Sequence, residues 1–580
     1  MRVAALLGGL LATLAAIPVA AEVTRFEITT REVINSGRPF GDRGPYVRLA
    51  GRVHYEIDVD HGLYPRPFGR IDVVDLKHAS RNKHGRVEFW SDFEALTPED
   101  PAKSNHTVLY DVNNRGNKLA LRFFCNGGGN DLSKTEAFGD GLLLRHGFTI
   151  LWSGWDGEIM PGDHRLLLNA PLARGENGPI TGPVCCEVIV DKPAYRTLVV
   201  PWANHGSYRP VPDLIENATL TLRERASDER VLLPRDQWKL HVTDVDSPNP
   251  TQLPKLEIEV SGGLKPGWIY ELIYTAQDPL VMGIGFMGVR DLLVAVRSGK
   301  GDNNPFLADD EPHLSQTMAF GVSQSGRFLR EFLRTGFNLP SLSEDKAFDV
   351  LIPHVAGGGL GSFNHRFAQP TRHGGQHDHS DTPTDRFPFA YDDQIDPLSG
   401  QTGGILQPDL GVGCRVTSNP IILHTQSSAE YWTRAGSLPH TDPLGLHDAE
   451  LYGCVRFYTF GGTQHGPAGY PPEKGISQQL ANPADYRPFL RALLLKAREE
   501  ELKGAAPQPS IMPRINDGTL IPWRDAVAMF PKIPGVKTPN TIHEPLWLFW
   551  GERWHTERII DVQPPRVLGS CIRSRRVPSA

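Results

Sequence analysis

Short runs of alternating hydrophobic and polar residues, separated by Gly and Pro, recur in two parts of the chain. Such alternation is typical of β-strands with one buried face. The first part predicts an N-terminal β-rich region over residues 22–105, and the second predicts a β-rich insertion over residues 161–266. The runs lie at residues 24–28, 47–50, 53–57, 218–222 and 256–260.

Other short, apolar runs predict the strands of a buried core. They lie at residues 108–112, 148–152, 316–320, 420–425 and 455–460. After the third run, apolar residues recur at helical spacing over residues 328–333, and residues 281–296 predict another helix. Strands that alternate with helices predict an α/β fold, with a mostly parallel sheet flanked by helices.

The length of 580 residues exceeds that of one simple core. We therefore expect the core in two parts, residues 106–160 and 267–545, on either side of the β-rich insertion. Residues 361–412 are rich in Gly, Pro and Asp and predict a lid-like insertion. We expect residues 546–580 to form a C-terminal tail, and we interpret the short cluster Arg573-Ser574-Arg575-Arg576 in it as solvated.

A serine lies between the third apolar run and the helix that follows it. The sharp turn from a strand into a helix requires small residues around a nucleophile. Gly321, Ser325 and Gly326 meet this requirement around Ser323. Ser325 fits less well as nucleophile, because Arg327 would then occupy a position that needs a small residue. The pattern indicates a nucleophile elbow that carries Ser323.

A serine nucleophile needs a base and an acid, and after such an elbow the acid precedes the His along the chain. Glu430 follows the fourth apolar run, and His465 lies in a Gly-rich loop after the fifth. We therefore predict a Ser-His-Glu triad. Asp442 and Asp448 are alternative acids, because both also precede His465.

The oxyanion formed in such a reaction needs preorganised N–H donors. The elbow supplies one at Gln324, and the polar turn after the first apolar run predicts a second at Asn114 or Arg115. Arg115 can equally bind a substrate carboxylate or lie on the surface. Candidates for a substrate-binding wall are the tryptophans Trp152, Trp155 and Trp432. For the first two, ordinary packing is the alternative.

The N-terminus has the features of a signal peptide. Arg2 precedes an apolar stretch that ends in small residues, which predicts cleavage after Ala21 and a periplasmic or secreted protein. The apolar stretch is shorter than the ~20 residues that a membrane span needs. A formal net charge of −7 and the lack of a long basic run argue against a nucleic-acid partner.

Six cysteines in an exported chain permit disulfides. Cys414 and Cys454 precede the fourth and fifth apolar runs, which we expect to form neighbouring parallel strands. The sequence therefore predicts a Cys414–Cys454 disulfide. Cys125 is a candidate partner for Cys185 or Cys186.

Two further motifs match binding patterns only formally. Residues 283–288 read G-x-G-x-x-G, but a dinucleotide site needs a strand directly before the motif and an acidic residue at the end of the next strand. Close helix packing explains these glycines better. His373, His377 and His379 have metal-ligand spacing without an evident fourth ligand. We expect no cofactor and no metal ion.

With these motifs placed, the sequence resembles a large bacterial family of exported proteins described as "alpha/beta hydrolase domain". The segments that match are residues 44–46, 110–118, 321–327, 430–432 and 462–465. The resemblance covers nearly the whole mature chain and implies an α/β-hydrolase fold with hydrolytic chemistry, but no settled substrate. Similar members continue past residues 564–567, whereas this chain runs into Arg-rich sequence, so a truncated or frame-shifted C-terminus stays open.

These features together predict an exported serine hydrolase that cleaves carboxylic esters through an acyl-enzyme. One alternative is an amidase or peptidase with the same triad. Another is a carbohydrate- or polymer-binding protein without catalysis, in which the β-rich segments dominate. The expected partner is a small-molecule or polymer ester; the particular ester and the oligomeric state do not follow from the sequence.

Overall fold

The structure is a computed structural model. It describes residues 22–59, 65–66, 69–70, 73–191, 195–338, 346–372, 381–406, 419–475, 477, 479–504, 508–570 and 574–579. The expected signal peptide, Cys414 and the segment from His373 to His379 lie outside the described residues.

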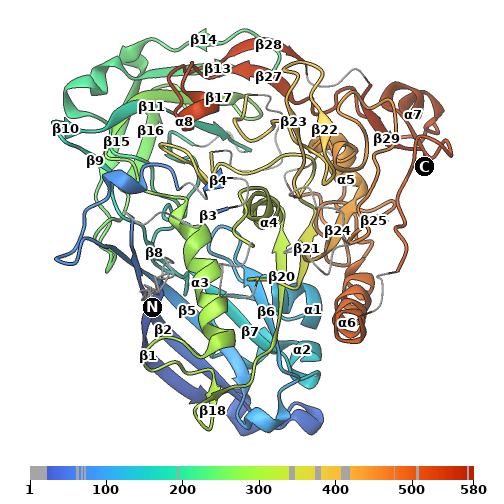
Figure 1. Cartoon of the computed structure of the whole chain (residues 1–580). Helices are drawn as coiled ribbons and strands as arrows, with labels where there is room; N and C mark the ends of the chain where they lie inside the picture. Colours follow the sequence, from blue (N-terminus) through green and yellow to red (C-terminus); the bar gives the residue numbers. More distant parts are fainter. Residues whose placement is uncertain are drawn as a thin grey trace, which may run out of the picture.

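A ten-stranded sheet forms the centre of the molecule (Figure 1), with the order β1-β2-β5-β7-β6-β20-β21-β24-β25 and β8 paired to β5. Neighbours from β7 to β25 are parallel, whereas β1, β2 and β5 pair antiparallel. The mostly parallel sheet expected from the sequence is therefore present. The strands are β1 (Glu22–Val33), β2 (Tyr46–Ile57), β5 (Val87–Pro98), β6 (Thr107–Val112), β7 (Thr149–Ser153), β8 (Leu168–Asn169), β20 (Gln316–Val322), β21 (Val350–His354), β24 (Ile421–Ser427) and β25 (Val455–Phe460).

Helices cover both faces of this sheet. Helices α3 (Ile284–Ser298) and α4 (Gln324–Arg334) pack on one face. On the other lie α1 (Ala120–Cys125), α2 (Leu142–Arg145) and α6 (Arg487–Lys503). Successive strand residues alternate between the two hydrophobic clusters, as the period of two in a strand dictates. Both faces are apolar, which explains why the core strands appear as apolar runs without alternation.

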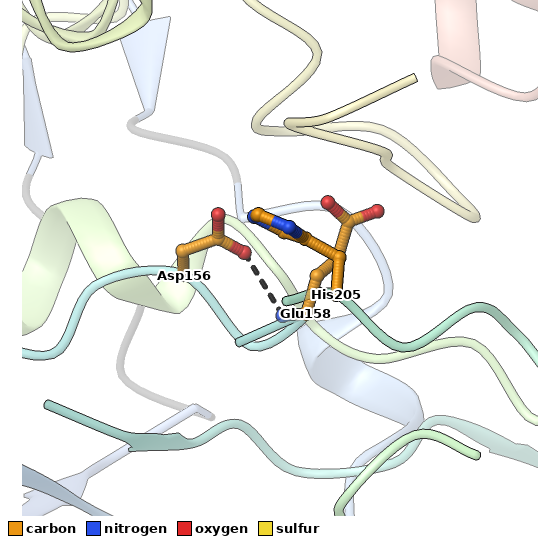
Figure 2. Close-up of side chains that lie close together, drawn as sticks. All are labelled: Asp156, Glu158 and His205. Atoms are coloured by element: carbon orange, nitrogen blue, oxygen red, sulfur yellow. Dashed lines mark hydrogen bonds between the residues drawn. The ribbon is translucent and has the colours of Figure 1, made fainter. Parts of the chain in front are cut away.

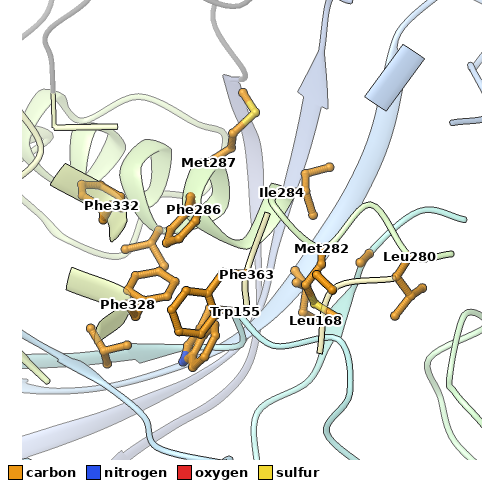
Figure 3. Packing of buried hydrophobic residues seen from close by; sticks show 14 of the residues in the cluster. Trp155, Leu168, Leu280, Met282, Ile284, Phe286, Met287, Phe328, Phe332 and Phe363 are labelled. Atoms are coloured by element: carbon orange, nitrogen blue, oxygen red, sulfur yellow. The ribbon is translucent and has the colours of Figure 1, made fainter. Parts of the chain in front are cut away.

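The first cluster is rich in aromatic rings near α3 and α4. Figure 3 shows Phe286 from α3 and Phe328 and Phe332 from α4 gathered with Trp155 and Phe363. Phe328 lies 4.6 Å from Phe286 and 4.7 Å from Trp155 between ring centroids. This packing fixes α4, and with it the turn that precedes α4.

The β-rich segment forms two small antiparallel sheets, with the orders β11-β17-β13-β14 and β12-β16-β15. Strand β17 pairs with β11 and β13, so this module extends beyond the boundary predicted at residue 266. Its strands are β11 (Thr181–Ile189), β12 (Thr197–Val200), β13 (Thr219–Arg223), β14 (Val231–Leu232), β15 (Trp238–Thr243), β16 (Lys255–Val260) and β17 (Ile269–Gln277).

The C-terminal segment packs onto the domain, and the interpretation of its arginines as a solvated tail is wrong. Arg575 forms an ion pair with Glu544, and Arg576 donates hydrogen bonds to the carbonyl oxygens of Gly445 and Leu520. Strand β29 pairs with β26. The elements here are β26 (Leu520–Pro522), α7 (Trp523–Met529), β27 (Leu546–Phe549), α8 (Trp554–Glu557), β28 (Arg566–Ser570) and β29 (Arg576–Pro578).

The remaining elements are short. They are β3 (Pro65–Arg66), β4 (Gly69–Arg70), β9 (Arg174–Gly175), β10 (Gly178–Pro179), β18 (Leu307–Ala308), β19 (Glu311–Pro312), β22 (Gln394–Ile395), β23 (Thr402–Gly403) and α5 (Ser428–Thr433). Within the described ranges, no helix has the length and apolar character needed to cross a membrane.

The cysteines follow the expectation only in part. Cys454 is disulfide-bonded, and its predicted partner Cys414 lies outside the described residues, so that pairing stays a prediction. Cys125, Cys185 and Cys186 are buried free thiols, so the suggested pairing among them is wrong.

Candidate active site

Ser323 occupies a strained turn between β20 and α4. Its φ of 58° and ψ of −111° are unusual for a residue with a side chain, and its N–H donates to the His354 carbonyl at 2.8 Å. A Cβ on Gly321 would lie 2.3 Å from the Ser325 carbonyl oxygen, and one on Gly326 would lie 2.9 Å from that of His354. The requirement for small residues around the elbow therefore has a steric cause.

The two serines of the elbow have different environments. Ser325 is fully buried, and its hydroxyl donates to the Asn113 carbonyl at 3.1 Å. Ser323 is only half-buried. A nucleophile must be reached by substrate, so the geometry favours Ser323.

Glu430 and His465 meet at the same edge of the sheet. Glu430 lies in α5 directly after β24, and His465 lies in the loop after the neighbouring strand β25. Oε1 of Glu430 lies 2.6 Å from Nδ1 of His465. Oε2 accepts from the N–H and the hydroxyl of Ser427, at 2.9 and 2.5 Å, as part of a capping box. The buried carboxylate is thus held by its own helix and directed at the histidine.

The two alternative acids are bonded elsewhere. Asp442 contacts Nδ1 of His447 at 3.0 Å, and Asp448 accepts from the N–H groups of Ile515 and Asn516. Among the predicted acids, Glu430 is therefore the one that contacts His465.

A buried histidine, His354, connects the elbow to the His465 loop, and no sequence motif marks it. Nδ1 of His354 lies 2.8 Å from the Thr425 hydroxyl, and Nε2 lies 3.1 Å from the Tyr486 hydroxyl. Tyr486 donates its single proton to the His465 carbonyl at 2.8 Å, so Nε2 of His354 must donate to Tyr486. Burial lowers the pKa of His354 well below its usual value, which keeps the ring neutral in this role. Since Ser323 N–H bonds to the His354 carbonyl, one residue supports both loops.

Residues 261–518 match a family model described as an alpha/beta hydrolase domain. This part of the chain is an alpha/beta hydrolase domain. The match contains Ser323, Glu430 and His465 and confirms the family expected from the sequence motifs. Searches of curated proteins and of solved structures found no match.

The hydrolase domain has a helix N-terminus and a polar turn beside the nucleophile. Gln324 is the first residue of α4, and its side chain donates to Pro370 O and Thr371 Oγ1 at 2.7 and 3.0 Å. The Asn114 side chain donates to Val322 O at 2.6 Å and so fastens the predicted second oxyanion loop to the elbow. The Asn114 N–H already donates to Asn117 O, which favours Arg115 as the second donor.

A cavity beside the elbow is lined by cationic side chains. Arg115, Arg327, Arg372 and Arg434 line it, with Asp385 as an acidic residue of the same wall. Burial together with the charge of Arg434 lowers the pKa of Arg327 to about 9 and that of Arg115 to about 10. Residues of the predicted lid-like insertion also line this cavity, including Ser362, Phe363, Gln369, Thr382 and Thr384.

Two of the candidate tryptophans lie in the core of the hydrolase. Nε1 of Trp152 donates to Asp111 Oδ2 at 2.6 Å, and Nε1 of Trp155 donates to the Asn113 carbonyl at 2.8 Å. Both side chains are almost fully buried, which favours packing over substrate contact. Trp432 is half-buried and packs against the cluster around Leu520.

The glycines of the formal G-x-G-x-x-G motif allow close packing. A Cβ on Gly283 would lie 2.3 Å from Oδ1 of Asn364, and one on Gly285 would lie 2.1 Å from the Trp155 carbonyl oxygen. These contacts account for both glycines without a bound cofactor.

Two clusters within the described residues have metal-ligand geometry. Asp156, Glu158 and His205 form one, shown in Figure 2, and the second is formed by Glu187, Glu271 and Asp381. In each cluster the potential ligand atoms lie within 4.8 Å of one another. Sequence spacing identified neither.

Proposed function

We propose that the protein is a serine hydrolase that cleaves carboxylic esters, with Ser323 as nucleophile, His465 as base and Glu430 as acid. The observation that carries this proposal is the combination of a strained Ser323 elbow with a Glu430–His465 contact of 2.6 Å on the same hydrolase domain. A nucleophile, a base and a residue that orients the base are the elements that acyl transfer requires.

In the proposed mechanism, Nε2 of His465 removes the Ser323 proton as Oγ attacks the ester carbonyl carbon. The electron pair of the carbonyl bond moves onto the oxygen, where the N–H of Gln324 and a donor at Arg115 would stabilise the oxyanion. The C–O bond to the alcohol then breaks, and His465 protonates the leaving alcohol. Water then attacks the acyl carbon of the acyl-enzyme with His465 again as base. The bond from the acyl carbon to Ser323 Oγ breaks, His465 returns a proton to Ser323, and the carboxylic acid is released. Glu430 stabilises the imidazolium through Nδ1.

The cationic cavity supports a narrower substrate class, an ester that carries an anionic group. Four arginines face one aspartate across this wall, so the net charge beside the nucleophile is positive. Repulsion between the four guanidinium groups is unfavourable, and a bound anion would relieve it. Guanidinium groups form strong hydrogen bonds with carboxylate and phosphate. Arg327 lies one helical turn after Ser323, since its N–H donates to the Ser323 carbonyl at 3.0 Å.

The preference for esters over amides rests on analogy among simple hydrolases of this fold. The test compares an ester and an amide with the same acyl group, each with and without a carboxylate on that group. We expect turnover of the ester, with the carboxylated form preferred. Faster turnover of the amide would favour the amidase alternative, and polysaccharide binding without turnover would favour a binding protein. We also propose export, on the basis of the signal-peptide pattern ending at Ala21.

A further inference from the structure

Three buried side chains converge behind the hydrolase site from two segments of the chain. Asp156 and Glu158 follow β7, and His205 follows β12. None of the three is more than 1% exposed, and in Figure 2 their carboxyl groups and imidazole ring point toward one another. Their potential ligand atoms lie within 4.8 Å of one another, which is compatible with a shared ion about 2.0–2.4 Å from each.

The cluster lacks the hydrogen bonds that such burial requires. Oδ1 of Asp156 accepts from the Glu158 N–H, and Oε2 of Glu158 accepts from the Thr371 N–H, both at 2.9 Å. Among the described residues, Oδ2 of Asp156 and both ring nitrogens of His205 have no hydrogen-bond partner. Leaving a buried polar group without a hydrogen bond is unfavourable, so three such atoms in one place indicate a missing binding partner.

The electrostatics favour a cation as that partner. The site holds one imidazole and two carboxyl groups, all of them buried, and neither ring nitrogen of His205 takes part in a hydrogen bond among the described residues. Arg115 compensates one of the two carboxylates at most. A divalent ion would neutralise the pair.

In the second cluster, Glu271 and Asp381 are buried carboxylates that are neutralised by arginine side chains. Glu271 is paired with Arg223 and Arg230 at 3.2 and 2.7 Å, and Asp381 is paired with the same arginines at 3.4 and 2.6 Å. Arg223 and Arg230 lie where an ion would have to bind and supply the positive charge that it would bring. Glu271 and Asp381 of the second cluster therefore belong to an ion-pair network, whereas no such pair with Asp156 or Glu158 is found among the described residues.

We propose that Asp156, Glu158 and His205 bind one divalent transition-metal ion. One imidazole with two carboxylates suits Zn²⁺ or Mn²⁺ better than Ca²⁺, which prefers oxygen ligands. The ion joins the loop after β7 to the β-rich module. Through the Glu158–Thr371 bond it also supports the segment on which the Gln324 side chain rests. Its role is structural, because none of the three ligands contacts Ser323, Glu430 or His465 in the described contacts.

The test measures metal content and Zn²⁺ binding on the full chain. Protein dialysed against a chelator is equilibrated with Zn²⁺ or Mn²⁺, and bound metal is measured by mass spectrometry. We expect about one high-affinity equivalent per chain, reduced at least tenfold in occupancy in His205→Gln and in Asp156→Asn. The matched control is Asp381→Asn, which alters the ion-pair network and should keep the metal.

A second measurement protects the test from misfolded variants. Co²⁺ loaded into the unaltered protein should give a visible absorption spectrum, and Zn²⁺ added afterwards should displace it. Metal retained in both His205→Gln and Asp156→Asn would overturn the proposal. So would loss of the metal on changing His377 and His379 to Gln, because it would place the ion in the histidine-rich segment. Less than 0.1 equivalent of bound Zn²⁺ would also overturn the proposal. A buried water molecule would then be the better explanation of the unsatisfied polar atoms.

Discussion

Two of the places where a buried carboxylate lies beside a histidine are built in opposite ways. In the hydrolase site, both oxygens of Glu430 have hydrogen-bond partners, and the His465 side chain is 29% exposed. In the second site, His205 is fully buried and neither ring nitrogen has a partner among the described residues. The first arrangement suits the proton transfer that we propose between His465 and the Ser323 hydroxyl. The second offers lone pairs without donors, which is what a metal ion requires.

The side chains of the two sites are also held in place in different ways. Glu430 is fixed by the capping box of its own helix, so the acid needs no distant residue. Among the described residues, the side chains of Asp156 and Glu158 each accept one backbone hydrogen bond, from the N–H groups of Glu158 and Thr371, and the His205 ring has none, so the cluster depends on whatever fills its centre. Removing one side chain should therefore affect chemistry in the first site and stability in the second.

Removal of the nucleophile should have the largest effect. Ser323→Ala is expected to lower kcat for the ester by about 10⁴-fold or more, because no group remains to form the acyl-enzyme. The matched control is Ser325→Ala, which removes a buried hydroxyl two residues away and should keep most of the activity. Steady-state kinetics on the same ester checks both variants. A Ser325→Ala enzyme that is as inactive as Ser323→Ala would show that the elbow has been misassigned.

Glu430→Gln comes next. The amide keeps the shape but cannot stabilise the imidazolium, so kcat should fall by about 10³–10⁴-fold. Asp442→Asn serves as the control, since that carboxylate contacts His447, and its kcat should change less than twofold. Equal losses in both variants would contradict the choice of acid.

Chelation should lower stability with a smaller effect on chemistry. When the free-ion concentration is 100 times the Kd, removing the ion lowers the free energy of unfolding by about 2.7 kcal/mol. We expect the melting temperature to fall by roughly 2–5 °C on chelation and to recover with Zn²⁺, judging from the size scaling of Tm shifts. The same treatment should not change the melting temperature of His205→Gln. A chelation shift that persists in that variant would separate the metal from this cluster.

Arg327→Gln should weaken the use of anionic esters. Loss of one charge-assisted hydrogen bond, worth about 1.5–3 kcal/mol, should raise KM for a carboxylated ester by about 10–100-fold. KM for the matched neutral ester should stay within twofold. Arg334→Gln is the control on the same helix, because Arg334 does not line the cavity. An equal rise in KM for both esters would remove the case for anion recognition.

The smallest effect is expected from Tyr486→Phe. It removes the donor to the His465 carbonyl, a bond worth about 1 kcal/mol, and should lower kcat about fivefold. Tyr458→Phe is the matched control, since Tyr458 donates in the same way to Gln508 O at 2.8 Å, away from His465. A loss of activity in Tyr458→Phe as large as that in Tyr486→Phe would indicate a general effect on stability.

Local patterns predicted the part of the site that is local in sequence. The elbow is a turn with steric requirements, so Gly321 and Gly326 identify it directly. The bounds of strand β25 agree with the prediction, Val455–Phe460, because Gly461 and Gly462 directly follow the run and mark its end. Strand β21 was missed, since Pro353 interrupts its apolar run and Pro is rare in central strands. His354 was missed with it.

The second site had no sequence signal. Its residues lie on a loop of the core and on the β-rich module, and only the packing of that module brings His205 beside Asp156. The histidine-rich segment from His373 to His379 had the expected spacing, whereas the cluster of Asp156, Glu158 and His205 has none. Burial and the balance of donors and acceptors are properties of the folded chain and do not appear in the spacing.

Active-site labelling shows whether Ser323 is the nucleophile. The full chain is treated with a fluorophosphonate, digested, and mapped by mass spectrometry. We expect one stoichiometric adduct on Ser323, present in Ser325→Ala and absent in Ser323→Ala. An adduct on Ser325, or ester hydrolysis that continues at the normal rate in Ser323→Ala without an adduct, would contradict it.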